Sequence, residues 1–319
     1  MIALSLSKGN LSLKKAVIPE IKPLYSLVKI TLAGICSTDL HLLKGYKGFS
    51  GIPGHEFVGT VVESEESFLL NKRVVGEINI GCEKCDMCSR QIPNHCRYRK
   101  VLGILNYNGV HAEYALIPNK NLYVVPSHIN DKDAVFVEPL AAACRIFHQL
   151  NISKDTSVAV IGDGKLSFTI ATALIAKGCL PKIVGKYSHK LNIFKSLGCS
   201  VQKNDEHNDF RRTDVVIECT GSPSGVDLAL EMICPQGVLV LKSTYSGTTP
   251  VSLSDIVVNE ISVVGSRCGL FSDALKLLSE HSLNFSSIVE SIFPLSEGVK
   301  AYEAAQRPGA QKILLDCEQ

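Results

Sequence analysis

The sequence has little net charge, no long apolar run and no leader-like pattern at its first residues. Lys and Arg total 33 and Asp and Glu total 31, which leaves a formal charge of +2 on 319 residues. A chain without a basic excess has no electrostatic drive toward nucleic acid or an anionic membrane, so neither is an expected partner. No stretch reaches the roughly 18 uncharged apolar residues that a spanning helix needs, and a basic leader segment is missing. We therefore expect a soluble, cytoplasmic protein.

Length and composition indicate a globular chain of two domains. A chain of 319 residues exceeds what one hydrophobic core commonly serves. Hydrophobic residues make up 45% and charged residues 20% of it, as in ordinary folded proteins. In the first third, short apolar runs broken by turn residues predict β-strands, among them 2–6, 11–15, 27–32 and 57–63.

From residue 157 onward, apolar runs alternate with helical stretches. Strands are expected at 157–162, 182–185, 214–219, 237–243 and 261–265, and a helix at 165–177. This alternation predicts a parallel sheet with helices on both of its faces. The tail is predicted to hold helices near 273–280 and 295–306 and a last strand at 312–316.

Twelve cysteines are present, and four of them follow the pattern Cys-x2-Cys-x2-Cys-x7-Cys: Cys82, Cys85, Cys88 and Cys96. Thiolates at this spacing converge on one zinc ion in a closed, tetrahedral site. Disulfides and cysteines buried as small hydrophobic residues are the alternatives, and both suit a turn-rich loop without an export signal poorly. The spacing predicts a structural zinc ion, which does not by itself indicate an enzyme. A zinc ribbon for nucleic acid would use the same cysteines, but the near-neutral charge argues against it.

Further ligand types stand at three separate places: Cys36, the pair His55-Glu56, and Glu138. A single His or Cys is more often a buried structural residue than a ligand. Glu138 also suits the first turn of a helix. Spacing alone does not link these residues.

Together with their neighbours, the same residues form a collinear set of motifs. The strings are GICSTDLH at 34–41, GIPGHEFVG at 51–59, the four-cysteine loop, NGVHAEY at 108–114 and VEPLA at 137–141. The set extends over essentially the whole chain and resembles the zinc-containing medium-chain dehydrogenase/reductase superfamily, the group of alcohol, sorbitol and threonine dehydrogenases. The resemblance implies an α/β protein with a GroES-like, mostly β catalytic domain at 1–140 and 266–319. A Rossmann domain with a doubly wound parallel sheet is expected at 141–265.

The resemblance also implies an open zinc site in the catalytic domain. Cys36, His55 and Glu138 match the ligands of the family's catalytic zinc, and Glu56 matches a neighbouring acid that binds zinc in some states. Three protein ligands leave a position for a water or substrate oxygen, whose negative charge the zinc stabilises. Whether Glu56 or Glu138 is the ligand at rest stays open.

Three residues close to Cys36 complete the catalytic set that the resemblance implies. Asp39 matches the acid that orients the histidine ligand. Thr38 matches the residue whose hydroxyl touches the substrate oxygen, and His41 matches a further step of a proton relay. An ordinary loop histidine is the alternative for His41.

The run Gly162-Asp-Gly164-Lys-Leu-Ser167 follows a predicted strand and opens a helix, as a dinucleotide fingerprint requires. Gly162 permits the tight turn, and Gly164 lets the pyrophosphate approach the helix N-terminus. Ser167 replaces the usual third Gly or Ala. The residues expected to bind the coenzyme here are Gly162, Asp163, Gly164, Lys165 and Leu166.

The end of the next strand bears on the choice of coenzyme. NAD-binding relatives carry an acid there that bonds the adenosine ribose, whereas this chain has Gly185, followed by Lys186, His189 and Lys190. An acid repels a 2′-phosphate, so its loss beside basic residues predicts a preference for NADP(H) over NAD(H). A lysine-rich loop without selectivity is the alternative.

Three more residues are coenzyme-binding candidates: Thr220 and Gly221, at the end of a later strand, and Arg267. The whole set predicts an oxidoreductase with two zinc ions per chain that transfers a hydride between a nicotinamide coenzyme and a small alcohol or carbonyl substrate. A secondary alcohol or ketone is expected, in a pocket shaped by loops 44–50 and 102–108, and the resemblance implies a homodimer or homotetramer. The alternatives are an NAD-linked polyol or amino-alcohol dehydrogenase and a non-catalytic coenzyme-binding relative. The intact zinc ligands and Thr38 argue against the latter.

Overall fold

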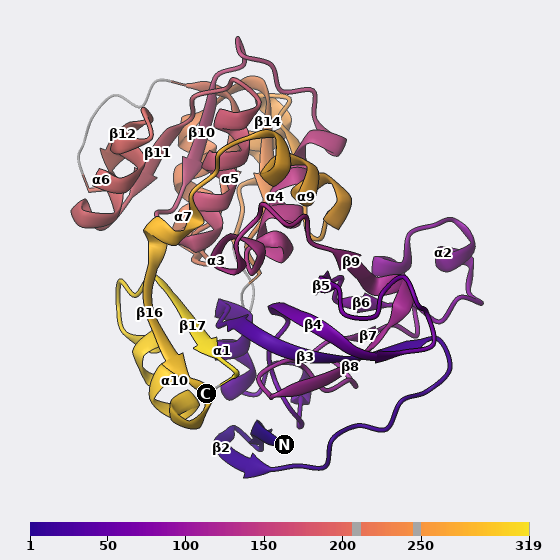
Figure 1. Ribbon diagram of the computed structural model, residues 1–319. Coiled ribbons are helices and arrows are strands. Elements are labelled where there is room, and N and C mark those ends of the chain that lie inside the picture. Colours follow the sequence, from indigo (N-terminus) through magenta and orange to yellow (C-terminus); the bar gives the residue numbers. More distant parts are fainter. Residues whose placement is uncertain (206–211, 245–249, 319) are drawn as a thin grey trace. The chain divides into compact units, whose positions relative to one another are not determined.

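The computed structural model describes residues 1–205, 212–244 and 250–318, which fall into two compact units (Figure 1). The terminal unit comprises Met1–Glu138 and Phe271–Gln319, and the central unit comprises Pro139–Leu270. The sequence-based boundaries were after residues 140 and 265. Each unit has its own sheet and core.

The terminal unit is built on a seven-stranded sheet. Its strands follow the order β16-β17-β3-β4-β5-β9, and β8 also pairs with β3. The ladders of β3 with β4, β8 and β17 are antiparallel, as expected for a mostly β domain with short connections. The strands are β1 Ile2–Ser7, β2 Asn10–Lys15, β3 Tyr25–Gly34, β4 Glu56–Ser64, β5 Arg73–Gly76, β6 Asn79–Ile80, β7 Lys100–Val101, β8 Tyr114–Pro118, β9 Leu122–Val124, β16 Val289–Pro294 and β17 Lys312–Asp316.

Short helices and a hairpin complete the terminal unit. Its helices are α1 Ser37–Leu43, α2 Asp86–Ser89, α3 Asp131–Ala134, α9 Phe271–Glu280 and α10 Gly298–Gln306, and α4 Val137–Gln149 begins at its boundary. The two expected strands at 2–6 and 11–15 are β1 and β2, which form a hairpin with Lys8 and Gly9 both at positive φ in its two-residue turn. Leu6 of this hairpin packs on Leu42 and Phe49, so the hairpin supports the end of α1.

Strand register decides which residues meet at one end of the β3 ladder. Gly34, the last residue of β3, is opposite Glu56 of β4 and opposite Leu314 of β17. The chain passes from Gly34 directly into the segment that holds Cys36. Residues from three distant parts of the sequence are therefore brought to the same end of the sheet.

The central unit is a six-stranded parallel sheet in the order β12-β11-β10-β13-β14-β15. The order reverses between β10 and β13, which is the doubly wound Rossmann arrangement predicted from the sequence. Helices α5, α6 and α7 pack on this sheet (Figure 1). The elements are β10 Val158–Ile161, α5 Lys165–Ala176, β11 Lys182–Gly185, α6 Ser188–Ser196, β12 Ser200–Lys203, β13 Thr213–Glu218, α7 Pro223–Met232, β14 Ile233–Leu241, α8 Leu253–Val258 and β15 Ser262–Gly265.

No helix among residues 1–205, 212–244 and 250–318 is long and apolar enough to cross a membrane.

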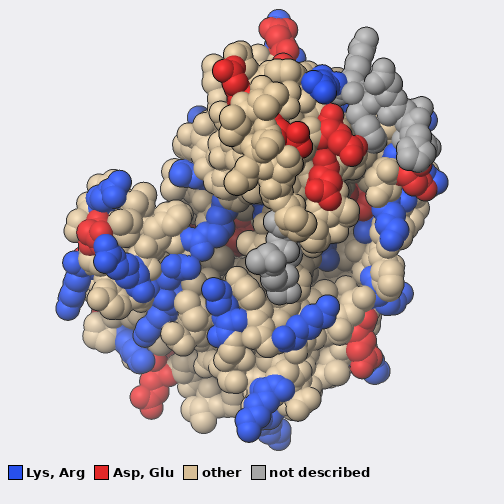
Figure 2. Space-filling model, turned by 180° about the vertical axis from the view of Figure 1, so that it is seen from behind, with Lys and Arg blue, Asp and Glu red and all other residues tan. Residues whose placement is uncertain are grey.

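Charges of both signs occur on the surface. Figure 2 shows a face on which basic side chains are spread widely and acidic side chains form smaller groups. Several are paired, as in Lys29–Glu318 at 3.0 Å and Arg97–Asp86 at 2.9 Å. Exposed pairs of this kind each contribute little to stability.

Candidate functional site

The end of β3 and the start of β4 bring three potential metal ligands together. Ligand atoms of Cys36, His55 and Glu56 all lie within 4.8 Å of one another. His55 and Glu56 are buried, and Cys36 is half-buried. These three side chains, which we call the donor set, offer one sulfur, one imidazole nitrogen and one carboxylate oxygen.

Asp39 orients two members of the donor set. Its Oδ1 lies 3.3 Å from Nδ1 of His55, and its Oδ2 accepts the backbone N–H of Cys36 at 2.8 Å. Burial raises the pKa of Asp39, but the neighbouring His55 more than offsets this and lowers it below its ordinary value. An ionised Asp39 holds Nδ1–H of His55, which leaves Nε2 for a ligand.

The chemistry of the donor set fits a zinc ion. Burial by itself lowers the pKa of His55, yet Asp39 and Cys36 raise it well above its ordinary value. Burial raises the pKa of Cys36, but the neighbouring His55 lowers it by more, so the net pKa of Cys36 lies below its ordinary value. The site therefore favours a thiolate with a cation next to it. A divalent cation supplies that charge, and zinc accepts mixed sulfur, nitrogen and oxygen ligands.

Lys312 lies against the same cluster. Its ammonium group donates a hydrogen bond to Oε2 of Glu56, and both side chains are buried. The same nitrogen is 5.3 Å from the centre of the Phe136 ring. Burial lowers the pKa of Lys312 to about 8, so the ammonium form persists at neutral pH. The carboxylate of Glu56 thus already has a cationic partner, which competes with any metal for it.

Glu138, the remaining predicted ligand, is outside the donor set. It is half-buried in the first turn of α4 and is not among the side chains whose ligand atoms meet within 4.8 Å. Burial, and to a lesser extent the negative charge of Glu138, raises the pKa of Glu77 above its ordinary value. The role of Glu138 as a ligand stays a prediction.

Thr38 and His41 lie one turn apart on α1 and therefore share a face of that helix. Oγ1 of Thr38 is 3.8 Å from Sγ of Cys36. His41 is half-buried, and burial together with Lys44 lowers its pKa below the ordinary value. A neutral His41 is able to accept a proton near neutral pH.

His111 supports the loop that carries His55, a role that the sequence did not reveal. Its Nδ1 is 2.9 Å from the Tyr302 hydroxyl, and its Nε2 is 3.3 Å from the carbonyl oxygen of Gly34. Burial lowers the pKa of His111, so a neutral ring donates to Gly34 and accepts from Tyr302. A Cβ at Gly54, whose φ is +96°, would collide with this ring. The string NGVHAEY contains His111, but only the fold shows what it touches.

The four predicted cysteines form a second cluster. Sulfur atoms of Cys82, Cys85, Cys88 and Cys96 lie within 4.8 Å of one another, and none of the four is in a disulfide. Two backbone N–H groups, those of Cys82 and Tyr98, point to Sγ of Cys96 at 3.3 Å. The N–H of Cys88 lowers the pKa of Cys85 to about 6. Four convergent thiols with N–H donors around them fit a closed zinc site.

The turn from β10 to α5 has the geometry of a phosphate-binding loop. Gly162 adopts a φ of +120°, and a Cβ there would meet Oγ of Ser167 and the carbonyl oxygen of Cys219. Apart from Gly164 and its neighbours along the chain, none of the described residues has an atom within 4 Å of where a Cβ on Gly164 would be, so the backbone is approachable there. Lys165 and Leu166 open α5, and the first N–H groups of a helix have no partner inside it.

Asp163 of this turn reaches the end of β11. Its Oδ2 accepts the backbone N–H groups of Lys186 and Tyr187, each at 2.7 Å. A Cβ on Gly185 would lie 2.8 Å from that oxygen. The Asp163 carboxylate therefore lies at the end of β11, although position 185 itself is a glycine and carries no acid.

The basic residues after β11 surround Tyr187. Nζ of Lys186 and Nζ of Lys190 lie 5.6 Å and 5.0 Å from the centre of its ring, and the rings of His189 and Tyr187 are 5.8 Å apart. Lys190 is buried, whereas Lys186 and His189 are exposed. These contacts hold the basic side chains close to the end of the strand.

The remaining coenzyme-binding candidates lie after β13 and β15. Thr220 donates its N–H and its hydroxyl to Oε1 of Glu218 at 2.6 Å and 2.5 Å. Gly221, at a φ of +71°, donates its N–H to Oγ of Ser243 at 2.8 Å. Arg267 is exposed, and its carbonyl oxygen accepts a hydrogen bond from Lys242. Thr220 and Gly221 thus form an ordered turn near the point where the strand order reverses.

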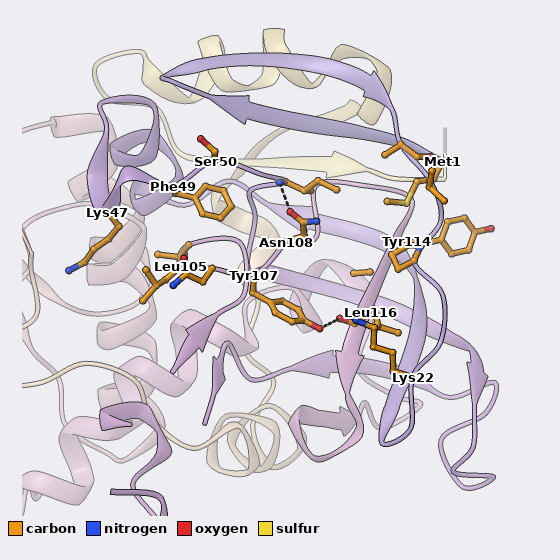
Figure 3. A pocket seen from close by; sticks show the side chains of 18 of the residues that line it. Met1, Lys22, Lys47, Phe49, Ser50, Leu105, Tyr107, Asn108, Tyr114 and Leu116 are labelled. Atoms are coloured by element: carbon orange, nitrogen blue, oxygen red, sulfur yellow. Dashed lines mark hydrogen bonds between the residues drawn. The ribbon is translucent and has the colours of Figure 1, made fainter. Parts of the chain in front are cut away.

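A cavity of about 760 Å³ opens in the terminal unit (Figure 3). Lys47 and Lys22 lie at opposite ends of it, and no acidic side chain is among the described residues that line it. Asn108 braces its wall by accepting the N–H of Ile52 at 3.1 Å. The cavity is lined in part by residues of loops 44–50 and 102–108, the two loops expected to shape a substrate pocket. No member of the donor set lines it.

Comparisons with known proteins show which family the chain resembles over its length. Residues 22–127 match the family described as "Alcohol dehydrogenase GroES-like domain", and residues 167–281 match "Zinc-binding dehydrogenase". A sorbitol dehydrogenase of Halalkalibacterium halodurans is 28% identical over 90% of each chain. A solved alcohol dehydrogenase from Escherichia coli CFT073, complexed with NADH, is 25% identical with a TM-score of 0.92 over 99% of each chain. A putative zinc-binding dehydrogenase from Sinorhizobium meliloti 1021, bound to NADP, is 26% identical with the same TM-score over 99% of this chain and 98% of its own.

Proposed function

Since the chain belongs to the zinc-containing medium-chain dehydrogenase/reductase superfamily and is an oxidoreductase of the alcohol dehydrogenase type, we propose that it interconverts a small secondary alcohol and a ketone. A nicotinamide coenzyme accepts or supplies the hydride in this reaction. The observation that carries the proposal is the buried donor set of Cys36, His55 and Glu56, held by Asp39. Zinc bound to such ligands polarises the oxygen of an alcohol or carbonyl group.

The chain's own residues would position the substrate and move its proton. The Thr38 hydroxyl would hydrogen-bond the substrate oxygen, and its distance of 3.8 Å from Sγ of Cys36 supports this role. His41, one turn further along α1, would accept the proton that passes through Thr38. Asp39 keeps its role as the group that orients His55. A hydroxyl followed by a neutral imidazole gives the proton a path to solvent.

For the catalytic zinc we propose Cys36, His55 and Glu138 as ligands at rest. Lys312 supports this choice over Glu56, because the ammonium group already neutralises the Glu56 carboxylate. The negative charge of Glu138 contributes to the raised pKa of Glu77, and a cation bound by Glu138 would offset that repulsion. Cys82, Cys85, Cys88 and Cys96 would hold a second, structural zinc. A dimer or tetramer remains the prediction for the assembled enzyme.

The preference for NADP(H) that the sequence predicts is supported by Lys186, His189 and Lys190. The carboxylate of Asp163 at the end of β11 opposes it, because like charges repel. Relatives bind either coenzyme, as the NADH and NADP complexes illustrate. Basic side chains and the Asp163 carboxylate both lie at the end of β11. The choice of coenzyme therefore depends on which of them is closer to the bound coenzyme, and the number of basic residues does not decide it.

A polyol substrate is the second candidate, favoured by the similarity to a sorbitol dehydrogenase. The test is a panel of secondary alcohols, polyols and amino alcohols, offered with NAD and NADP to zinc-loaded and to chelator-treated protein. We expect turnover that requires zinc and is faster with secondary than with primary alcohols. Coenzyme binding without turnover of any compound would instead assign the chain a non-catalytic role.

The relay through His41 predicts a pH dependence. Because burial lowers the pKa of His41, its neutral form is present at pH 7 and is lost as the pH falls through a value below 6.5. We expect alcohol oxidation to fall over that same acid range. A His41→Gln variant should lose about a hundredfold in kcat and no longer show that acid limb. Steady-state kcat across the pH range measures both effects, and an unchanged profile would remove His41 from the relay.

A further inference from the structure

We propose that Asp163 takes the place of the missing ribose-binding acid and makes the coenzyme site select NAD(H) over NADP(H). The inference rests on the proposed use of a nicotinamide coenzyme, and it reverses the preference predicted from the sequence. It assigns coenzyme selectivity to a residue on the phosphate-binding turn, not to one at the end of β11.

The position of the carboxylate is the first argument. In a Rossmann sheet the acid that bonds the adenosine ribose extends from the end of the second strand, which is β11 here. A Cβ at Gly185 would lie 2.7 Å from Cβ of Asp163 and 2.8 Å from its Oδ2. The Asp163 side chain thus fills the space that a side chain at position 185 would take. Gly185 is required there because Asp163 is present.

The hydrogen bonds of Asp163 are the second argument. The backbone N–H groups of Lys186 and Tyr187, which could otherwise donate to a 2′-phosphate at the end of β11, both donate to Oδ2 of Asp163 at 2.7 Å. A phosphate would have to displace the carboxylate and would meet its negative charge. Within the part of the chain that the structure describes, both hydrogen bonds of the carboxylate go to Oδ2, which leaves Oδ1 to accept a ribose hydroxyl proton. NAD(H) has that hydroxyl, whereas NADP(H) has a phosphate in its place.

The basic residues do not outweigh this carboxylate. Lys186 and Lys190 lie over the ring of Tyr187, which positions their ammonium groups through contacts with the ring. Asp163 is held directly against the strand end by two hydrogen bonds of 2.7 Å, so its charge is fixed at the end of β11. The position of a charge relative to the ribose affects the selectivity between NAD(H) and NADP(H) more than the number of charged residues does.

The test compares NADH and NADPH binding to the zinc-loaded protein and to its Asp163→Asn variant. Since the chain has no tryptophan, the fluorescence of the reduced nicotinamide itself reports binding. We expect NADH to bind the unaltered protein about tenfold or more tightly than NADPH. Asparagine keeps an oxygen acceptor for the two N–H groups and removes the charge, so NADPH affinity should rise about tenfold. NADH affinity should fall, because the amide NH2 group that replaces Oδ1 cannot accept the ribose hydroxyl proton.

Asp155→Asn is the matched control. Asp155 is exposed just before β10, at the opposite end of the strand that leads to Asp163, and its loss should leave both affinities unchanged. Tighter NADPH than NADH binding by the unaltered protein would overturn the inference and leave the proposed function intact. An equal loss of both coenzymes in a folded Asp163→Asn variant would make Asp163 a structural part of the turn. Failure of the unaltered protein to bind either coenzyme would overturn the proposed function itself.

Discussion

A Cys36→Ser variant is expected to lose alcohol oxidation by at least about a thousandfold while it still binds the nicotinamide coenzyme. The hydroxyl of serine does not ionise near neutral pH and is a poor zinc ligand compared with a thiolate. Several kcal/mol of stabilisation of the reacting oxygen would be lost with the metal. Steady-state kinetics measures the loss, and coenzyme fluorescence measures the binding that remains.

Zinc content separates this explanation from a general loss of structure. The unaltered chain should hold two zinc ions, and the Cys36→Ser variant should hold one, in the four-cysteine loop. Cys234→Ser, a change of the same kind at a half-buried cysteine of the central unit, should keep both ions and full activity. Two zinc ions and normal turnover in Cys36→Ser would show that Cys36 is not a ligand.

The sequence predicts the central unit well because its strands are short, apolar and bounded by polar turns. The expected strand at 182–185 is β11, and the expected strand at 261–265 is β15, Ser262–Gly265. The edge strands β12 and β16 were not predicted from the sequence. In β12, Ser200–Lys203, only Gln202 is buried, so no apolar run marks it. The parallel strand β16, Val289–Pro294, is likewise only partly buried and reads as loop.

The two clusters of potential zinc ligands were predicted for different reasons. The four cysteines are close in sequence, so their spacing alone indicates a metal site. The donor set joins Cys36 with His55 and Glu56 through the β3–β4 register, which only a resemblance to known proteins could suggest beforehand.

Contacts that depend on strand register and on side-chain direction could not be predicted. Lys312 reaches Glu56 because β17 pairs with β3, and a sequence alone does not show a contact between residues 256 positions apart. Asp163 reaches the end of β11 because the turn after β10 points its side chain across the sheet edge. In both cases the sequence shows a charged residue, but it does not show which group that residue contacts in the fold.

A Lys312→Met variant is expected to be destabilised by about 3–5 kcal/mol in the absence of zinc. Both members of the Lys312–Glu56 pair are 2–3% exposed, and removal of one partner leaves an uncompensated charge in the core. Zinc should recover part of the loss, because Glu56 is then available as a ligand. Denaturant unfolding with and without zinc measures both quantities, and zinc should stabilise the variant more than the unaltered protein.

Two further variants show whether the lost stability comes from the buried pair itself. Lys29→Met makes the same substitution in the exposed Lys29–Glu318 pair on the same sheet, and there the cost should stay below about 1 kcal/mol. The double variant Lys312→Met, Glu56→Gln removes both charges, so it should be more stable than Lys312→Met alone. If the single and double variants were equally unstable, the loss would come from packing around Lys312, including its contact with Phe136, and not from charge pairing. In that case the ammonium group would not compete with zinc for Glu56, and Glu56 would replace Glu138 as the expected ligand at rest.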